Sequence, residues 1–538
     1  MYSFNATPCF NFFRFIRAAA YYLTLFFISQ LSLAANLVQI ENAKPGFAEW
    51  DDFYAPSNVH DMEGYANKES VNPGDSIAFY VNANPRIDAN FKLAVYRLGW
   101  YGGAGARRVV TPVVIISKSQ NIPASDKVTG MVQANWVKSY ELIVPKTWLS
   151  GIYVVTVIGN TSKKGQYIPF VVREINRNSD YLFQVATLTW QAYNAWGGKS
   201  LYSYNSNAVP VASDTDLTDD AHIPARKVSF NRPYDDWQGL GLLTAWEIKM
   251  LFFLEREGYD VTYQTDTDSH IGNGGLLNHK ALLSVGHDEY WTKSMRNNFQ
   301  TAQNHGIGLG FFGANTAFWQ VRLESASAPL VTQKYRTLVG YKEYAETEDP
   351  LATNVSTIDD NLVTSLWRDE RWANSPENEL VGIMYSFWPV NGNVITTKTD
   401  PKLANGKPSH WIYTGTGLGV GAVFKGLLGY EADRVFNNGK TPANLQIVAS
   451  SSVPTNAVEY PEFASSSVSQ PKAHMTVYTK PCTLTPCNNP VSTVFASGTM
   501  QWVWGLDSYL RTVNLENRLV KKITRNVLAR LISAPLPK

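Results

Sequence analysis

Cysteine is scarce: the 538-residue sequence contains only three. Cys9 lies in the N-terminal segment, which leaves Cys482 and Cys487 as the pair available to the rest of the chain. A structural zinc site needs four ligands, and no histidine lies close behind this pair, which argues against zinc there. Six residues bounded by prolines suit a small loop closed by a disulfide in an oxidising compartment. We therefore predict a Cys482–Cys487 disulfide.

Long hydrophobic runs are lacking beyond the first 34 residues. Within them, the apolar run 18–28 is too short to span a bilayer, follows two arginines and precedes an A-x-A-like pattern that ends at Ala34. This layout predicts a secretory signal peptide over residues 1–34, and hence a secreted or periplasmic protein with no stable membrane insertion after cleavage. An uncleaved membrane anchor is the alternative, because the aromatic-rich segment 10–15 lengthens the apolar run.

Net charge is nearly absent as well, with 47 Lys and Arg against 45 Asp and Glu. Residues 1–34 contain two arginines and no acid, so the remaining chain has 45 charges of each sign and a net charge of zero. A neutral surface without a basic stripe argues against nucleic acid as a partner.

Three catalytic signatures are also missing. The sequence contains no G-x-S-x-G, no H-E-x-x-H and no Walker A pattern. Serine-triad hydrolysis of the nucleophile-elbow kind is therefore not expected.

The part of the chain that follows the signal peptide is too long for one hydrophobic core, so we expect at least two domains. Residues 37–175 have the pattern of an all-β, immunoglobulin-like sandwich, because short β-branched and aromatic segments alternate with turn signals. The predicted strands are 76–81, 91–96, 136–144, 152–158 and 167–172.

Residues 177–535 have a different pattern, in which strands and helices alternate. Such alternation predicts an α/β domain with a largely parallel sheet and crossover helices. Residues 325–480 are irregular and are expected to hold extra hairpins and long loops. The predicted strands are 180–186, 259–262, 281–285, 308–312 and 493–497, and the predicted helices are 243–257, 293–305 and 517–531.

Candidate site residues follow the predicted strands, because ligands of parallel α/β sheets bind beyond the carboxyl ends of strands. His287, Asp288 and Glu289 follow strand 281–285 directly. If Asp288 or Glu289 caps the next helix, the presence of one acid is explained. Capping does not explain why His287 and Glu289 both occur directly after a glycine at the end of a strand. Asn315 lies in a second predicted strand-to-helix turn, where it either donates a hydrogen bond to an oxyanion or caps the helix.

Two tyrosines complete the candidate set. Tyr193 lies beyond strand 180–186, and Tyr234 lies further on in the segment RPYDD. A tyrosine at a strand end is ordinarily a packing residue. Together with Glu289, however, the two phenols offer hard oxygen donors that suit a hard ion such as ferric iron.

Seven ordered segments carry a more specific resemblance. These segments, in the order in which they are given below, are similar to the C-terminal domain of the N,N-dimethylformamidase large (beta) subunit family. Two earlier segments, GYANKESVNPGDSIAFYV and YRLGWYGG, resemble the sandwich that precedes this domain. The resemblance implies an α/β fold similar to class I glutamine amidotransferases. The segments are TLTWQAYNAWGGKSLY, VSFNRPYDDW, FLEREGYDVTYQTDTD, LLNHKALLSVGHDEYW, GFFGANTAFW, GLLGYEADR and FASGTMQWVWGLD.

The same resemblance implies the site and its chemistry. It implies a mononuclear iron, expected as Fe3+, held by Tyr193, Tyr234 and Glu289. It places His287 and Asn315 beside the substrate and assigns Glu431, in GYEADR, as the catalytic acid and base. Such an iron acts as a Lewis acid on an amide carbonyl or on a water. The implied activity is hydrolysis of the C–N bond of a small amide.

Two features separate this chain from that family. The dimethylformamidase acts inside cells with a small partner subunit, whereas this sequence has an export signal. The competing interpretation is therefore a non-catalytic exported adhesion or glycan-binding protein that uses an amidotransferase-like domain, with its many aromatic residues as a binding platform.

Overall fold

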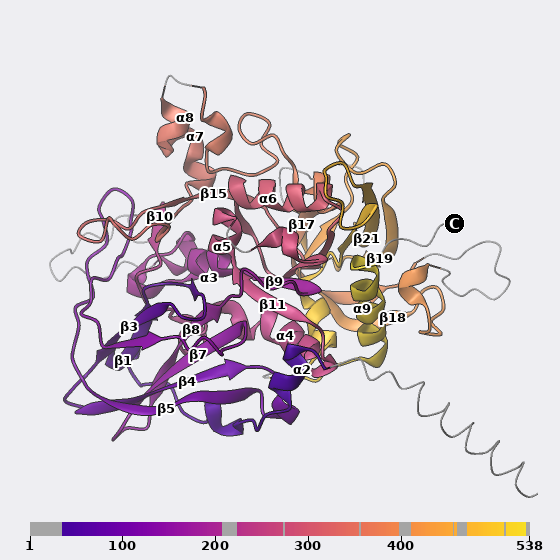
Figure 1. Cartoon of the computed structure of the whole chain (residues 1–538). Helices are drawn as coiled ribbons and strands as arrows, with labels where there is room; N and C mark the ends of the chain where they lie inside the picture. Colours follow the sequence, from indigo (N-terminus) through magenta and orange to yellow (C-terminus); the bar gives the residue numbers. More distant parts are fainter. Residues whose placement is uncertain are drawn as a thin grey trace, which may run out of the picture.

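The computed structural model describes residues 35–206, 223–272, 275–354, 357–397, 410–455, 457–459, 471–509 and 513–533. The predicted signal peptide lies outside these residues. Within them, no helix is long and apolar enough to cross a membrane. The described residues form five β-sheets with helices packed between and around them, which is a mixed α/β architecture (Figure 1).

Residues 62–172 form two β-sheets that face one shared core, seen at the lower left of Figure 1. The strand orders are β1-β3-β6 and β2-β8-β7-β4-β5, and all neighbours are antiparallel except β2 and β8. Phe79, Leu93 and Phe170 meet in the core between the sheets. The strands are β1 (Met62–Ala66), β2 (Ser70–Val71), β3 (Ser76–Ala83), β4 (Asn90–Leu98), β5 (Ala106–Ile116), β6 (Tyr140–Ile143), β7 (Gly151–Gly159) and β8 (Gly165–Val172).

The sequence patterns located four of these strands to within two residues at each end. The predicted strand 136–144 is shorter than expected, because only Tyr140–Ile143 pair with β3. Strands β1, β2 and β5 were not predicted. β5 lies at the edge of its sheet, where alternation between buried and exposed residues is weak.

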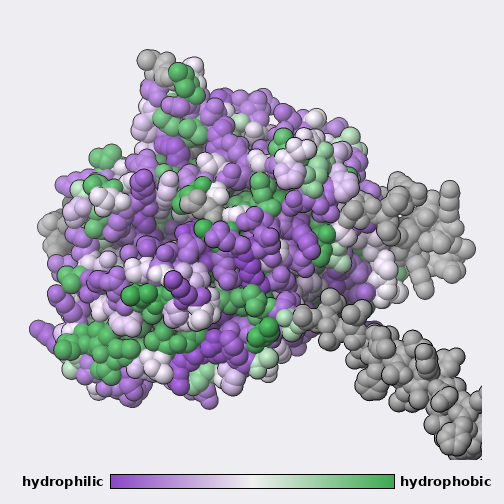
Figure 2. Space-filling model, viewed as in Figure 1, coloured by the Kyte–Doolittle hydropathy of each residue, from purple (hydrophilic) through white to green (hydrophobic). Residues whose placement is uncertain are grey.

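β5 also accounts for a hydrophobic band on the surface, visible at the lower left of Figure 2. Val114 is 59% exposed and Ile116 is 83% exposed. An open apolar edge strand can pair with the strand of another chain. A proline in the edge strand weakens such pairing, because proline lacks a backbone N–H group. Pro112 lies in the middle of β5 and has this effect.

Residues beyond 180 are organised around one seven-stranded sheet. Its order is β11-β9-β12-β14-β22-β21-β19; the first five strands are parallel, and the last two are antiparallel to their neighbours. This arrangement agrees with the predicted α/β class. The strands are β9 (Tyr181–Val185), β11 (Val261–Thr265), β12 (Ala281–Gly286), β14 (Gly308–Gly313), β19 (Gln446–Ser452), β21 (Lys472–Pro481) and β22 (Val491–Ala496).

The two faces of this sheet are covered by different layers. Successive strand residues point to opposite faces, so Leu282 and Leu283 enter separate cores. One core contains α4 (Glu247–Glu257) and α9 (Arg518–Leu531), and the other contains α6 (Lys293–Asn304). α4 ends where predicted, at Gly258, which has φ +74°. Burial on both faces explains why the strands are apolar throughout rather than alternating.

Two small sheets and five short helices complete the described fold. Residues 325–480, predicted to be irregular, contribute β17 and β18, which pair along most of their length. The small sheets have the orders β10-β16-β15-β13 and β18-β17-β20. The remaining elements are α2 (Leu37–Asn42), α3 (Thr187–Tyr193), α5 (Asp266–Ile271), α7 (Ala345–Glu348), α8 (Pro350–Thr353), β10 (Lys227–Ser229), β13 (Tyr290–Thr292), β15 (Trp319–Glu324), β16 (Thr337–Val339), β17 (Met384–Ile395), β18 (Val423–Arg434) and β20 (Val458–Glu459).

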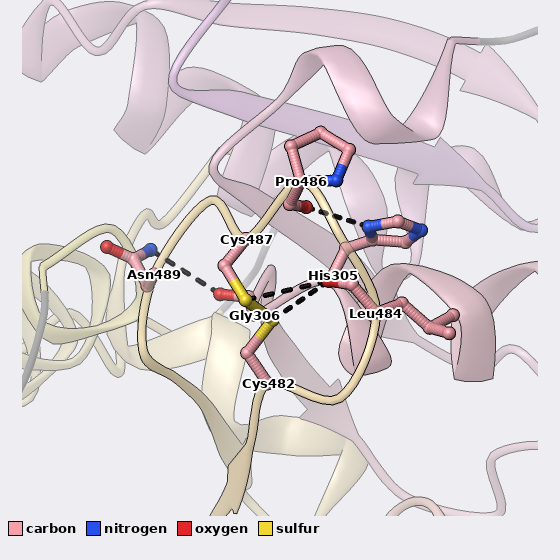
Figure 3. Close-up of a disulfide and its surroundings, with 7 residues drawn as sticks. All are labelled: His305, Gly306, Cys482, Leu484, Pro486, Cys487 and Asn489. Carbon is pink, nitrogen blue, oxygen red and sulfur yellow. Dashed lines mark hydrogen bonds between the residues drawn. A yellow bond between two sulfur atoms is a disulfide. The ribbon is translucent and has the colours of Figure 1, made fainter.

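The predicted disulfide between Cys482 and Cys487 is present (Figure 3). Its loop covers the C-terminal end of α6, where backbone carbonyls have no partner within the helix. The N–H groups of Thr483 and Leu484 donate to the carbonyl of Asn304 at 2.8 and 3.0 Å. The loop therefore caps this helix.

A buried ion pair joins the two-sheet region of residues 62–172 to the elements beyond residue 180. The guanidinium of Arg97, on β4, donates to both carboxylate oxygens of Glu255, on α4, at 2.7 and 2.9 Å. Both side chains are fully buried. Tyr263 and Asn42 donate to the same carboxylate at 3.0 and 2.6 Å. The outer face of the five-stranded sheet continues into the same hydrophobic core as α4.

We expect Glu255→Gln to lower the free energy of unfolding by about 3–5 kcal/mol, because it leaves a buried guanidinium without its counter-ion. Urea unfolding of the purified protein measures this effect. Glu141→Gln is the control, because Glu141 pairs with Lys138 at the exposed surface and its loss should leave the free energy of unfolding nearly unchanged. Equal effects of the two substitutions would contradict the assigned role of the Arg97–Glu255 pair.

A second buried carboxyl makes stability depend on pH. Burial raises the pKa of Glu247 to about 7. Its Oε1 accepts from Trp190 Nε1 at 2.8 Å, whereas its Oε2 has no partner. A raised folded-state pKa means that the folded protein binds this proton more tightly than the unfolded chain does. The resulting stability is fully present below about pH 4.5 and is lost as the pH rises through 7.

Glu247→Gln should therefore reduce the difference in unfolding free energy between pH 5 and pH 8 by up to about 3 kcal/mol, because glutamine cannot ionise. Urea unfolding of wild type and variant at both pH values gives the comparison. An unchanged difference would show that Glu247 does not carry this proton.

Candidate active site

The site begins where β12 and β14 end in glycines. Gly286 and Gly313 lie side by side in the sheet register. A Cβ on Gly286 would lie 2.3 Å from Trp246 Cβ, and one on Gly313 would lie 2.2 Å from the carbonyl oxygen of Gly286. Only glycine fits at both positions, which lets the following segments leave the sheet close together.

His287, Asp288 and Glu289 leave β12 with different roles. Asp288 turns into the core, where Gln184, Ser284 and Trp291 donate to its carboxylate. Neither acid caps the next helix, because Thr292 is the N-cap of α6. His287 and Glu289 are thereby free to face the site.

Glu289 lies at the centre of a group of phenols. The hydroxyl of Tyr193, the last residue of α3, donates to Glu289 Oε2 at 2.8 Å. The hydroxyl of Tyr202 lies 3.0 Å from both oxygens of Glu289 and 2.9 Å from the Tyr193 hydroxyl. Tyr290 donates to the Tyr202 hydroxyl at 2.6 Å. Three phenols and one carboxylate thus converge.

His287 connects this group with a second carboxylate. Its Nε2 lies 3.1 Å from Glu289 Oε2 and 3.3 Å from Glu431 Oε2, and it forms no aligned hydrogen bond with either. Glu431 is 6% exposed and His287 is 5% exposed. A buried imidazole nitrogen between two carboxylates is placed to exchange a proton with either one.

Asn315 fixes Glu431 from the other side. Its Nδ2 donates to Glu431 Oε2 at 3.0 Å, and its backbone N–H donates to Asp433 Oδ1 at 2.9 Å. The predicted strand-to-helix turn is wrong here, because the segment after β14 leads into strand β15. Asn315 therefore caps no helix. It has φ +54°, a strained value that these two hydrogen bonds help to maintain.

Tyr234 lies elsewhere. Its ring packs edge to face on Trp190 at 6.1 Å, and it lines a cavity together with Glu69 and Arg336. The described structure contains no hydrogen bond from Tyr234 to Glu289 or Tyr193. The phenol that contacts Tyr193 and Glu289 is that of Tyr202, which lies nine residues after Tyr193 in the segment TLTWQAYNAWGGKSLY.

Burial and charge shift the pKa values of the site. Burial, followed by the charge of Glu289, raises the pKa of Tyr193 and of Tyr202 well above 10. Burial alone would lower the pKa of His287, but the charges of Glu431 and Glu289 raise it to about 9. Burial and the charge of Glu289 raise the pKa of Glu431 to about 7.

Lys342 adds a positive charge that the sequence did not indicate. Its ammonium lies 3.5 Å from the ring centroid of Tyr202 and donates to the carbonyl of Leu201 at 3.1 Å. Burial by itself raises the pKa of Glu289, but the close contact and charge of His287, followed by the charge of Lys342, hold it below its usual value. Lys342 therefore stabilises the carboxylate form of Glu289.

The donor set fits a hard cation. Within the described residues, no group of three or more His, Cys, Asp and Glu is arranged to hold a metal. The converging donors are instead two phenols and one carboxylate, Tyr193, Tyr202 and Glu289. These are hard oxygen ligands, which suit a hard ion such as ferric iron better than they suit softer metals. Nε2 of His287 and Oδ1 of Asn315 are buried without a hydrogen bond, so each keeps the capacity to bind a further polar group.

The comparison with solved structures gives a weak match. The chain is similar to the alkylpurine DNA glycosylase AlkC of Pseudomonas fluorescens, bound to DNA containing an abasic site analog, at 14% identity and a TM-score of 0.14. The match covers 21% of this chain and 31% of that one. A TM-score this low carries no argument about fold or function.

Sequence comparison is more informative. No curated protein matches the chain significantly. The family described as N,N-dimethylformamidase beta subunit-like, C-terminal, matches residues 92–517. This range begins inside β4 of the sandwich and includes every residue of the site described above. The chain belongs to the N,N-dimethylformamidase beta subunit-like, C-terminal family.

Proposed function

We propose that this protein hydrolyses the C–N bond of a carboxamide with the help of an iron ion held by Tyr193, Tyr202 and Glu289. The family supports an amide hydrolase in general. The observation that carries the finer proposal is the geometry around Glu289: two phenols hydrogen-bond to its carboxylate, and His287 joins it to Glu431. When bound, the iron would supply Lewis acidity toward a carbonyl or a water.

Glu431 is the proposed proton carrier. Its carboxylate takes a proton from the attacking water and returns it to the nitrogen of the leaving amine. The new bond joins the water oxygen to the carbonyl carbon, and the bond that breaks is the C–N bond. The products are a carboxylic acid and an amine. A pKa raised to about 7 suits a group that accepts and returns a proton near neutral pH.

His287 and Asn315 support this transfer. The protonated imidazole places positive charge beside the developing oxyanion. Asn315 keeps the carboxylate of Glu431 in position through the hydrogen bond from its Nδ2. Both side chains are almost fully buried, which keeps bulk water away from the reacting atoms.

The finer fold and the location belong to the same proposal. We assign the two-sheet region to the immunoglobulin-like sandwiches and the larger domain to the class I glutamine amidotransferase-like folds. Two facing sheets and a central parallel sheet covered on both faces support these assignments. We also propose that residues 1–34 direct export, and the disulfide supports an oxidising destination.

The test uses the chain from residue 35 onward, expressed with iron. We expect about one iron per chain by elemental analysis and a visible phenolate-to-iron absorption band. Incubation with N,N-dimethylformamide and a panel of larger carboxamides should release amine and acid in equal amounts. Iron-loaded protein that releases amine from none of them would refute the proposed hydrolysis.

A further inference from the structure

A groove lies beside the site. Its volume is about 500 Å3, in the middle of the range for small-molecule sites. No charged side chain is among its described lining residues, so its occupant should be neutral. The lining is Pro389, Val390, Asn391, Gly426, Tyr430, Gln501, Trp504, Val513 and Leu515.

Aromatic rings form part of this lining. Tyr430 is 43% exposed, and its ring meets the edge of Trp388, itself 44% exposed, at 6.0 Å. Trp504 stacks with one face on Trp246 at 5.2 Å. The Gln501 amide accepts from the backbone N–H of Tyr430 at 3.3 Å and donates to the carbonyl of Gly426 at 2.9 Å. The rings are therefore held in place before a ligand arrives.

The groove is continuous with the elements of the site. Tyr430 directly precedes Glu431 on β18. Trp246, beneath Trp504, packs against Gly286, which directly precedes His287. Tyr204, whose ring lies 5.5 Å from that of Tyr202, is 68% exposed at the site. Tyr430 thus belongs both to the lining of the groove and to the strand that carries Glu431.

We propose that this groove binds a neutral N-acyl amino sugar and presents its amide to the site. A pyranose ring has apolar C–H faces and a polar rim, which match aromatic rings bordered by the carboxamide of Asn391 and backbone carbonyls. A charged ligand would find no counter-ion among the described lining residues, and a purely apolar ligand would leave these polar groups unpaired. The proposal rests on the proposed amide hydrolysis for the role of the sugar, but sugar binding itself does not require turnover.

The experiment measures binding by isothermal titration calorimetry to the Glu431→Gln protein, which should not turn the ligand over. The probe is N,N′,N″-triacetylchitotriose. Its deacetylated, cationic trimer and the apolar amide N-butylacetamide serve as comparisons. We expect binding of the acetylated trimer at least about tenfold tighter than either comparison, and a loss of about tenfold or more in Tyr430→Ala.

Two further variants separate the groove from general damage. Tyr430→Trp keeps an aromatic face and should bind within about threefold of the parent protein. Tyr54→Ala removes a tyrosine that is 80% exposed and lies outside the groove, and it should bind as the parent does. Absent binding, preference for either comparison ligand, or full binding by Tyr430→Ala would overturn the proposal. Sugar binding without release of acetate by the iron-loaded wild type would refute its catalytic role while leaving the binding site in place.

Discussion

Replacing Glu289 with alanine should empty the protein of iron and lower its amidase activity by about a thousandfold or more. Glu289 is the shared acceptor of two phenols, so its loss removes the anionic centre of the donor set. Lewis-acid assistance is worth several kcal/mol of transition-state stabilisation, and about 4 kcal/mol corresponds to a factor of about a thousand. Elemental analysis and the phenolate-to-iron band measure the metal, and amine release measures the activity.

A pair of tyrosine substitutions tests which phenols belong to the donor set. Tyr193→Phe and Tyr202→Phe should each abolish the absorption band or reduce iron content strongly. Tyr234→Phe is the matched control, because Tyr234 packs on Trp190 in the cavity that it lines with Glu69 and Arg336, and this variant should retain the metal. Full iron occupancy in Glu289→Ala, or loss of iron in Tyr234→Phe alone, would contradict the proposed set.

Replacing Glu431 with glutamine should lower kcat by about 100- to 10,000-fold while iron content stays at the wild-type level. The carboxamide keeps the shape of Glu431 and a polar contact for Asn315, but it cannot accept the water proton. Positioned acid–base catalysis contributes factors of this size. Steady-state kinetics with the best amide of the panel, together with elemental analysis of the same sample, give both readouts.

The Glu431 experiment has a surface control. Glu346→Gln replaces a carboxylate whose side chain is 66% exposed, and it should leave kcat unchanged. If Glu431→Gln lost its iron as well, Glu431 would act as a metal ligand rather than as the proton carrier. If it kept full activity, another group would have to move the proton.

Local patterns in the sequence predicted the five parallel strands of the seven-stranded sheet and the three longest described helices. The segments 152–158 and 281–285 are apolar and β-branched, and each became a strand within one residue of its predicted ends. Gly258 marked the end of α4 because its left-handed conformation suits few other residues. β17 and β18 were not placed, because their pairing depends on contacts between distant segments rather than on local composition.

The site was predicted in part for the same reason. His287, Glu289 and Asn315 follow strands, and parallel strands bring their carboxyl ends to one edge of a sheet. Tyr202 lies in an irregular segment, so no periodicity marked it, although it stood nine residues from Tyr193 in the same motif. Tyr234 was assigned from its donor chemistry and from the family resemblance, and neither of these gives its position relative to Glu289. Lys342 approaches Tyr202 from a distant turn, and no local pattern indicates such a contact.

The Arg97–Glu255 pair bears on how this protein can be divided for laboratory use. A fragment that starts near residue 177 would contain α4 with Glu255 buried and without its counter-ion. The complementary fragment would expose Arg97 on a sheet face that α4 no longer covers. Each fragment should be recovered mainly as insoluble aggregate. The shortest fragment that we expect to fold therefore extends from α2 through α9 as one continuous chain.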